Sequence, residues 1–327
     1  MFNSKSEMRF MNLDVDTTTD SVGEIGRLLI PGYHIVKEIG KGANGVVFKA
    51  IDERTKQEVA IKMLRASRQT DEENKNRFRR ELDIVFRMSH PYIIKIYKVE
   101  KNGRPYIIME YLKYSLRNLL YDRKIKLAKI DALRIVRKLA QALEYAHAKG
   151  IIHRDIKPGN IFFRKNGHPV LADFGLVKSI HARSDITQPN SLLGTPAYMS
   201  PELCRGKKAD PLSDIYSLGI VLFELLSGKL PYQGDTLHEL LKQHTNPSIP
   251  IPDLPSHAKE CQPLINLMMA KDKRRRINAA QVCAMIERLI EKTKVSPPGN
   301  TNKPILYLII AAVIVFFIVV ILMIFAI

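Results

Sequence analysis

Three glycines and one lysine near the N-terminal end have residue types and a spacing suited to phosphate chemistry. Gly40, Gly42 and Gly45 follow the G-x-G-x-x-G spacing within GKGANGVV. Because these residues lack side chains, their backbone N–H groups can approach phosphate oxygens closely. Lys62, in VAIK, ends an expected strand and could reach back beneath the glycine loop. Taken alone, each signal is weak, since a single such lysine is commonly a surface residue.

The residues after the glycines separate two classes of nucleotide site. A dinucleotide-binding loop needs a helix to begin at the third glycine, because the pyrophosphate rests on that helix N-terminus. Here VVFKA follows, a run typical of a strand. The sequence therefore predicts a hairpin whose loop folds over a nucleotide.

Two later motifs fit the same scheme. HRDIKPGN carries Asp155, Lys157 and Asn160 within six positions, and ADFG carries Asp173. Between and around them lie short apolar runs, IIH, NIFF and PVLA, that we expect to be strands.

The elements that must position these residues change character along the chain. Up to Leu112 the pattern is mostly β, with runs rich in β-branched residues and one stretch of helical periodicity at 71–89. The expected strands are 33–40, 45–52, 58–64, 92–100 and 105–112. Beyond Leu112 the periodicity is helical, and helices are expected at 129–150, 214–228, 236–244, 261–270 and 279–293. The fold class is therefore α+β, with a small β-rich lobe followed by a larger helical lobe.

In their order and spacing these motifs resemble those of eukaryotic-type (Hanks-type) protein kinases, in a bacterial-like form, from about Tyr33 to Thr293. The pattern HRDIKPGN, with Lys157 two places after Asp155, is similar to the serine/threonine branch. The resemblance implies the bilobal protein kinase fold, with an antiparallel sheet and one helix at 33–111 and a mainly helical lobe at 112–293. It also implies transfer of the ATP γ-phosphate to protein Ser and Thr hydroxyls, with Mg²⁺ as the metal and Mn²⁺ as an alternative ion.

Four residues receive catalytic or metal-binding roles from this resemblance. Asp155 is expected to orient the substrate hydroxyl and take its proton, and Lys157 to neutralise charge on the transferred phosphoryl group. Asn160 and Asp173 resemble the metal ligands, and both offer the hard oxygen atoms that Mg²⁺ prefers. Because Lys62, Asp155 and Asp173 are all present, an active enzyme is favoured over a pseudokinase scaffold.

The ATP-binding residues follow from the same resemblance. Lys62 is expected to hold the α- and β-phosphates, fixed by an ion pair with Glu81. The backbone of Glu110 and Leu112 would pair with the adenine edge, with Met109 as gatekeeper. The full predicted set is Ile39, Gly40, Gly42, Gly45, Val47, Ala60, Lys62, Glu81, Met109, Glu110, Leu112 and Phe162. The apolar members could equally be ordinary core, and LKYSLRNLL departs from the family by lacking a glycine turn and being one residue shorter.

Other polar residues are expected to regulate or brace the site. The segment between DFG and SPE carries several hydroxyls, of which Ser191 is the first candidate phosphosite and Thr187 the second; unmodified loop hydroxyls are the alternative. Glu202 is expected to be buried against Arg276, and Asp214 to brace the catalytic loop backbone. These last residues are structural rather than catalytic.

Charge and cysteine usage limit the classes of partner. A formal charge of +18 suits nucleic acid, a phosphorylated ligand or an acidic lipid surface, or it merely solvates the surface. The kinase resemblance implies no nucleic-acid partner. Cys204, Cys261 and Cys283 are too few and scattered for a disulfide framework or a zinc site.

The run ILYLIIAAVIVFFIVVILMIFAI, residues 305–327, predicts a transmembrane helix. About 23 residues make a helix of about 35 Å, enough to cross a hydrocarbon core of about 30 Å. Basic residues precede the run, so we expect a single-pass C-terminal anchor with the kinase domain cytoplasmic. The remaining expected parts are a flexible tail at 1–32 and a linker at 294–304.

Partners and rival functions complete the interpretation. ATP, protein substrates with Ser or Thr, the membrane and self-association for trans-autophosphorylation are the expected partners. A catalytically silent pseudokinase and a small-molecule kinase related to aminoglycoside phosphotransferases remain the alternatives. The latter lack a segment like GTPAYMSPE, which presents a peptide.

Overall fold

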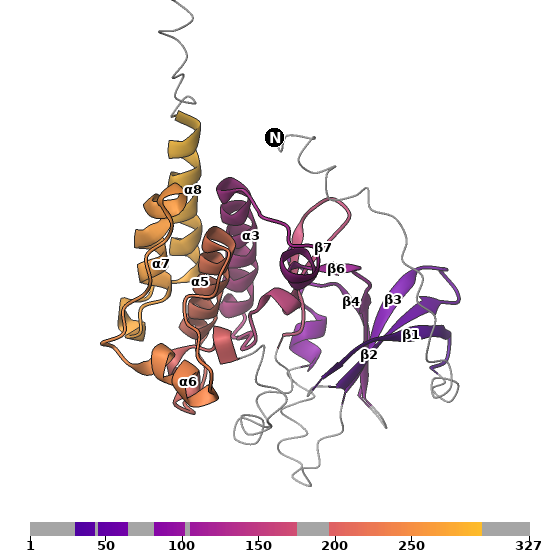
Figure 1. Cartoon of the computed structure of the whole chain (residues 1–327). Helices are drawn as coiled ribbons and strands as arrows, with labels where there is room; N and C mark the ends of the chain where they lie inside the picture. The colour runs from indigo at the N-terminus through magenta and orange to yellow at the C-terminus, as the bar shows by residue number, and fades with distance from the viewer. Residues whose placement is uncertain (1–29, 43–44, 65–81, 102–104, 175–195, 296–327) are drawn as a thin grey trace, which may run out of the picture. The chain divides into compact units, whose positions relative to one another are not determined.

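A computed structural model describes residues 30–42, 45–64, 82–101, 105–174 and 196–295 of the chain (Figure 1). The chain divides into two compact units, residues 1–287 and residues 288–327. The first unit holds both the sheet and the helices that surround the candidate site. The described part of the second unit is the end of one helix, residues 288–295.

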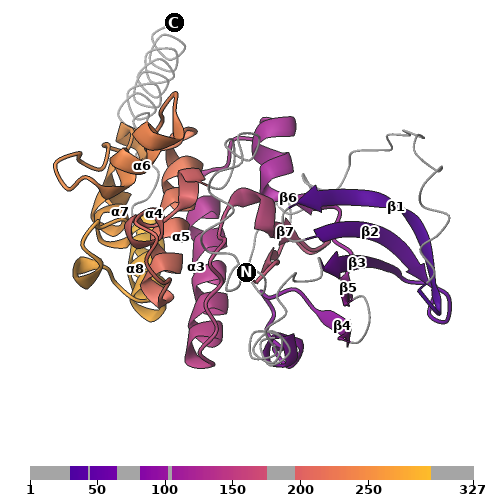
Figure 2. The same cartoon turned by 90° about the horizontal axis from the view of Figure 1, so that it is seen from below.

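A five-stranded antiparallel sheet forms the small lobe, and Figure 2 shows β1, β2 and β3 side by side. The strand order is β1-β2-β3-β5-β4. The strands are β1 (Tyr33–Gly42), β2 (Gly45–Asp52), β3 (Glu58–Leu64), β4 (Ile96–Glu100) and β5 (Tyr106–Glu110). All five overlap the runs rich in β-branched residues that predicted strands, because such residues suit a pleated backbone. Residues 82–86, the described end of the helix predicted at 71–89, are helical.

Helices dominate the large lobe after a short three-stranded sheet. That sheet consists of β6 (Tyr114–Ser115), β7 (Ile161–Phe163) and β8 (Pro169–Leu171). The α-helices are α3 (Lys129–Ala148), α4 (Pro201–Cys204), α5 (Pro211–Ser227), α6 (Leu237–Thr245), α7 (Gln262–Met268) and α8 (Ala279–Val295). A π-helical turn, η2 (Asn118–Asp122), precedes α3. Both views show α3 and α5 side by side, and α5 is buried along nearly its whole length.

The start of α5 differs from the prediction and has a clear physical cause. The apolar periodicity predicted a helix from Asp214, but α5 begins at Pro211. Asp210 accepts a hydrogen bond from the Ser213 backbone N–H, and the Ser213 side chain accepts one from the Asp210 backbone N–H, which forms a capping box. Gly228, in the left-handed region at φ 75°, ends the helix as predicted.

Two predicted strands are corrected by hydrogen bonds to distant residues. The strand predicted at 92–100 begins only at Ile96, because Ile93 and Ile94 pair with Leu171 of β8 instead. The strand predicted at 151–153 does not form. There the backbone N–H of His153 donates to the Asp214 carboxylate rather than to a neighbouring strand.

The predicted ends of the kinase domain also shift slightly. Ile30, assigned by the sequence to a tail, is 5% exposed and packs in a core cluster with buried residues of β2, β3 and β5. Helix α8 continues to Val295, two residues past the predicted boundary. Within the described residues, no helix is both long and apolar enough to cross a membrane. The span predicted at 305–327 lies outside them.

Candidate functional site

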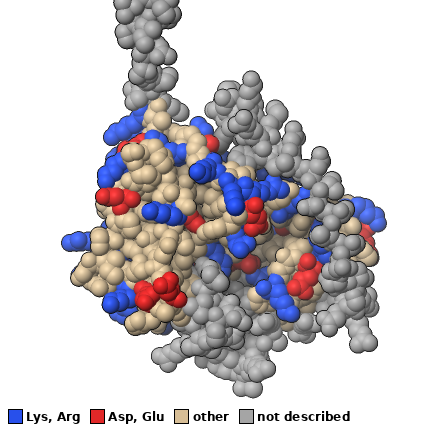
Figure 3. All heavy atoms as spheres, viewed as in Figure 1, with Lys and Arg blue, Asp and Glu red and all other residues tan. Residues whose placement is uncertain are grey.

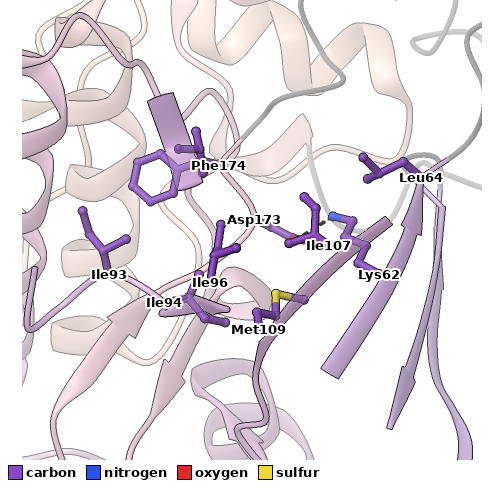
Figure 4. Close-up of a pocket in the computed structure, with 10 residues that line it drawn as sticks. Lys62, Leu64, Ile93, Ile94, Ile96, Ile107, Met109, Asp173 and Phe174 are labelled. Carbon is purple, nitrogen blue, oxygen red and sulfur yellow. Dashed lines mark hydrogen bonds and ion pairs between the residues drawn. The ribbon is translucent and has the colours of Figure 1, made fainter. Parts of the chain in front are cut away.

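Lys62 and Asp173 meet in an ion pair, although 111 positions separate them. Lys62 lies on β3, and its Nζ is 2.6 Å from Asp173 Oδ1. Figure 4 shows the amine directed toward Asp173, beside apolar side chains from β4 and β5. The partner predicted for Lys62, Glu81, lies outside the described residues. Lys62, which was expected to bind phosphate, therefore forms an ion pair with Asp173, which was expected to bind the metal.

Both residues of this ion pair line a mainly apolar pocket that Met109 also lines (Figure 4). Its lining residues are Lys62, Leu64, Val85, Ile93, Ile94, Ile96, Ile107, Met109, Asp173 and Phe174. Most of this lining is aliphatic, and Lys62 and Asp173 are its charged members.

Asp155 lies on the loop between α3 and β7, where it contacts a cationic side chain and a side-chain amide. It is 9% exposed, and Lys157 Nζ is 2.9 Å from its Oδ2. The Asn160 amide nitrogen donates both to Asp155 Oδ2, at 3.0 Å, and to its backbone carbonyl, at 2.7 Å. The three predicted catalytic residues are thus brought together, and Asp155 is held in one orientation. We call these three, together with Lys62 and Asp173, the catalytic group.

His153 links this loop to the segment that carries Asp173, a role that the sequence reasoning missed. The Asp155 backbone N–H donates to His153 Nδ1 at 3.2 Å, so Nδ1 is the acceptor and Nε2–H donates to the Ala172 carbonyl at 2.9 Å. Burial lowers the pKa of His153, which agrees with a neutral ring. Its ring also contacts Phe174, with centroids 4.6 Å apart. Its place directly before Arg154 and Asp155 is the only sequence signal.

Two residues of the site have left-handed backbone conformations. Arg154 has φ 66° and Asp173 has φ 61°. Such conformations are costly for residues other than glycine and persist where the surroundings impose them. Asp214 supplies part of this restraint, because its Oδ1 accepts the Arg154 backbone N–H at 2.8 Å.

The residues predicted to surround adenine form one apolar cluster. Ala60 and Met109 are buried, and Val47, Leu112 and Phe162 pack against them. The cluster joins strands β2, β3 and β5 of the small lobe to β7 of the large lobe. Ile39, also predicted to contact ATP, is 40% exposed on β1.

The glycines of the β1–β2 hairpin have different structural needs. Gly45 has φ 137°, and a Cβ there would lie 1.9 Å from the Met63 carbonyl oxygen, so the fold itself requires glycine. Among the described residues, no atom lies within 4 Å of a Cβ added at Gly42, and one lies 3.9 Å from a Cβ added at Gly40. Gly40 and Gly42 therefore leave open space on the loop, as close approach of a phosphate would require.

The shorter connection after β5 ends in its own hydrogen-bonded turn. Ser115 pairs with Phe162 across β6 and β7, and its Oγ donates to Asn118 Oδ1 at 2.7 Å. The Ser115 backbone N–H donates to the same oxygen at 3.0 Å. These two hydrogen bonds to Asn118 thus form the turn after β5, where the family that the sequence resembles has a glycine turn.

A second group of buried polar and charged side chains lies in the large lobe. It consists of Glu202, Ser213, Asp214 and Arg276, and we call it the frame. Arg276 binds Glu202 through two contacts, at 2.7 and 2.8 Å, and Ser213 Oγ donates to Glu202 at 2.5 Å. Burial alone would raise the pKa of Glu202, but the hydrogen bonds from Arg276 and Ser213 outweigh it and lower the pKa to about 2. The predicted pairing of Glu202 with Arg276 is confirmed.

Asp214 is the frame residue closest to the catalytic loop. It is 1% exposed and accepts the backbone N–H groups of His153 and Arg154, each at 2.8 Å. Its carboxylate also contacts His147 Nε2 at 2.8 Å. The prediction that Asp214 braces the catalytic loop is therefore confirmed.

The donors present fit a divalent metal ion. In the described hydrogen bonds the Asn160 side chain uses only its amide nitrogen, so its oxygen remains available as a ligand. The Asn160 backbone carbonyl accepts the N–H of Ala172, the residue before Asp173, at 2.9 Å. Among the described residues, no three His, Cys, Asp or Glu side chains gather as a metal site. Mg²⁺ commonly binds through one or two carboxylates together with substrate phosphates, which suits this sparse set.

Three expectations fall outside the described residues. Ser191 and Thr187, the candidate phosphosites, belong to the segment 175–195, and Glu81 belongs to 65–81. Their placement stays a prediction.

Comparison with known proteins gives matches over the same region. The protein kinase domain family model matches residues 33–286. A probable serine/threonine-protein kinase PknB of Lactococcus lactis is 37% identical over 229 residues, covering 69% of this chain and 36% of the relative. The serine/threonine-protein kinase PknA of Mycobacterium tuberculosis is 35% identical over 256 residues, covering 76% and 58%. The serine/threonine-protein kinase PrkC of Bacillus subtilis is 36% identical over 260 residues, covering 79% and 40%.

The chain spans between about a third and three fifths of the length of these relatives. The family match, in contrast, includes every residue of the catalytic group and the frame, and the described elements fit the bilobal kinase fold. This chain belongs to the protein kinase domain family.

Proposed function

We propose that this chain transfers the γ-phosphate of ATP to Ser and Thr hydroxyls of proteins. The observation that carries the proposal is the catalytic group itself: Asp155 is held by Lys157 and Asn160. The His153 ring links the Asp155 backbone to Ala172, next to Asp173 of the Lys62–Asp173 pair. The names of the matched relatives as serine/threonine-protein kinases support the choice of substrate class.

Each residue of the catalytic group has a proposed electrostatic task. Asp155, fixed by the Asn160 amide, orients the substrate hydroxyl and accepts its proton. Lys157, already 2.9 Å from Asp155, stabilises charge on the phosphoryl group in flight. Lys62 leaves Asp173 to bind the α- and β-phosphates. Asn160 and Asp173 would hold Mg²⁺, which would neutralise negative charge on the phosphates.

The adenine is proposed to lie in the apolar cluster between the lobes. Val47 and Ala60 would cover one face of the ring and Phe162 the other, while the backbone of Glu110 and Leu112 pairs with its edge. These aliphatic and aromatic side chains would give the proposed site, which we call the adenine slot, the apolar lining that small-molecule sites use.

A labelling experiment tests the proposed substrate class. The purified chain is incubated with γ-labelled ATP, Mg²⁺, a mixture of unstructured proteins and, separately, an aminoglycoside. We expect label on Ser and Thr of the proteins and, through self-association, on Ser191 or Thr187 of the chain. ATP binding without any transfer would support a pseudokinase, and label only on the aminoglycoside would support a small-molecule kinase. Either result would refute the proposal.

We further propose that residues 305–327 anchor the chain in a membrane, with the kinase domain on the cytoplasmic side. The support is a run of about 23 apolar residues without a charge, preceded by basic residues. The experiment compares the full chain with a variant that lacks 305–327, expressed in the same cells. The full chain should remain in the membrane fraction after alkaline extraction, whereas the shortened, still ATP-binding variant should not. Equal extraction of both would refute the anchor.

The basic charge of the chain supports a second contact with the membrane surface. Figure 3 shows Lys and Arg side chains spread over the face in view, with Asp and Glu less abundant. Near an anionic leaflet, each basic residue contributes about 1 kcal/mol of attraction. The variant lacking 305–327 should bind acidic vesicles in low salt and release them in high salt. Equal binding to neutral vesicles would count against this contact.

A further inference from the structure

Arg164 and Glu110 form a two-contact ion pair that joins the two lobes. Arg164 directly follows β7 of the large lobe, and Glu110 is the last residue of β5 in the small lobe. Arg164 Nε lies 2.9 Å from Glu110 Oε2, and Nη2 lies 2.6 Å from Oε1. Such fork-to-fork pairs restrict both distance and angle, unlike the point contact of a lysine.

The same guanidinium also binds the segment that leads into β4. Arg164 Nη2 donates to the Ile93 carbonyl at 3.2 Å, and Nη1 donates to the Pro91 carbonyl. Glu110 Oε1 in turn accepts the Lys95 backbone N–H at 2.8 Å. Three chain segments therefore meet at one partly buried ion pair, in which the Arg164 and Glu110 side chains are 26% and 15% exposed.

Residues expected to hold adenine lie next to both ends of this ion pair. Phe162 is two positions before Arg164 on β7, and Met109 directly precedes Glu110 on β5. Phe162 packs against the cluster that contains Met109 and Ala60. The ion pair therefore ties the end of β7 in the large lobe to the end of β5 in the small lobe, beside the proposed adenine slot.

We propose that Arg164 is a positioning residue for the nucleotide, acting through the Glu110 carboxylate to hold the adenine slot at its binding width. The inference rests on the proposed function only in taking ATP as the occupant of that slot. It assigns a task to the Glu110 side chain, whereas the sequence assigned only the Glu110 backbone.

The test compares Arg164→Gln, Glu110→Gln and the double variant in the full chain. Three quantities are measured: the Kd for ATP, the KM and kcat for phosphoryl transfer, and the Tm. We expect each single variant to raise Kd and KM for ATP about fivefold, with kcat within about twofold of the parent, since the catalytic group is untouched. The double variant should show no larger change than either single variant, because both remove the same ion pair. Arg164→Lys should recover part of the loss.

Arg137→Gln is the matched control. Arg137 also forms an ion pair with a glutamate, Glu287, at 2.9 Å, and its side chain is 32% exposed. Arg137 lies on α3, which contributes no residue to the apolar cluster of the adenine slot. This variant should lower the Tm without changing the Kd for ATP.

Two results would overturn the proposal. In the first, Arg164→Gln lowers the Tm as Arg137→Gln does and leaves the Kd for ATP unchanged, which would make the ion pair merely structural. In the second, the Kd changes of the two single variants multiply in the double variant, so the residues act independently. If the parent binds ATP but transfers no phosphate, the proposed function fails while the Kd comparison still decides the role of Arg164.

Discussion

The catalytic group and the frame both depend on paired charges, but they pair them in opposite ways. In the catalytic group, Lys62 and Asp173 share one contact, and the Asp173 side chain is 33% exposed. In the frame, Arg276 and Glu202 share two contacts, and the Arg276 side chain is fully buried. One pair can exchange partners with a phosphate and a metal ion, whereas the other has every oxygen of its carboxylate already bound.

The difference separates the charged residues proposed to take part in the reaction from those that stabilise the fold. A fully buried pair that loses one member leaves an uncompensated buried charge, whereas a remaining carboxylate that reaches solvent, as Asp173 does, is hydrated at little cost. The catalytic group should therefore tolerate substitution without unfolding, and the frame should not. The predictions below run from the largest expected change in stability to the smallest.

Glu202→Ala should reduce the free energy of unfolding by about 3–5 kcal/mol, because Arg276 stays buried without its partner. The Kd for ATP of the folded fraction should stay within about twofold of the parent, since Glu202 touches no residue of the catalytic group. Urea denaturation and ATP titration measure the two quantities. An unchanged unfolding free energy would show that the frame is not a stabilising unit.

The two hairpin glycines should separate folding from binding within a few residues. Gly45→Ala should cost about 2 kcal/mol or more of stability, because the new Cβ meets the Met63 carbonyl and the backbone has positive φ. Gly42→Ala should change stability by less than about 0.5 kcal/mol, since no atom of the described residues lies within 4 Å of the new methyl group. It should instead raise the KM for ATP about tenfold by displacing the phosphates. Equal losses of stability in both variants would contradict this assignment.

Acid should destabilise the large lobe partly through His244, which is fully buried on α6 with its Nδ1 2.9 Å from the Tyr216 hydroxyl. Burial, followed by the charge of Lys271, lowers the pKa of His244 to about 3. Its unfolded value is near 6.5, so the unfolded chain binds the extra proton first and stability falls as the pH drops from about 6.5 toward 3.

His244→Asn keeps a polar partner for Tyr216 but removes this titration. Between pH 7 and pH 5 the parent should lose about 1–2 kcal/mol more unfolding free energy than the variant. Chemical denaturation at the two pH values measures the difference. Identical pH dependence would assign the acid sensitivity to other groups, such as His153.

Lys62→Ala should change stability least and binding clearly. Loss of the pair with Asp173 should cost under about 1 kcal/mol of stability, since the Asp173 side chain reaches solvent. The Kd for ATP should rise at least about tenfold with the loss of a charged contact to phosphate. Thermal unfolding and ATP titration on one preparation test both. A large fall in Tm would place Lys62 with the frame instead.

Local patterns in the sequence were enough to predict most of the elements. The runs of β-branched residues along 45–52 and 58–64 and the helical periodicity along 129–150 are local signals, and strands and a helix form there. The start of α5 was missed although its signal was local: Asp210 and Ser213 form a capping box, with Pro211 in the first turn, and apolar periodicity does not register either feature.

Contacts between distant residues could not be predicted by the same means. The motifs identified Lys62 and Asp173, but nothing local indicates that the two side chains pair with each other across 111 positions. Ile93 likewise leaves the expected strand because of Leu171, 78 positions away. Arg164 carries no motif at all, so its ion pair with Glu110 becomes visible only in the fold.

The most direct test of the account is the initial rate of phosphoryl transfer by Asp155→Asn, with ATP binding and Tm measured on the same preparation. Asn keeps the shape of the side chain but cannot accept the proton, so the rate should fall by at least about a hundredfold while the Kd for ATP and the Tm stay near the parent values. Asp253→Asn, at a carboxylate whose side chain is 78% exposed, serves as the control and should keep the parent rate. A folded, ATP-binding Asp155→Asn variant that transfers phosphate at the parent rate would contradict the assignment of this site.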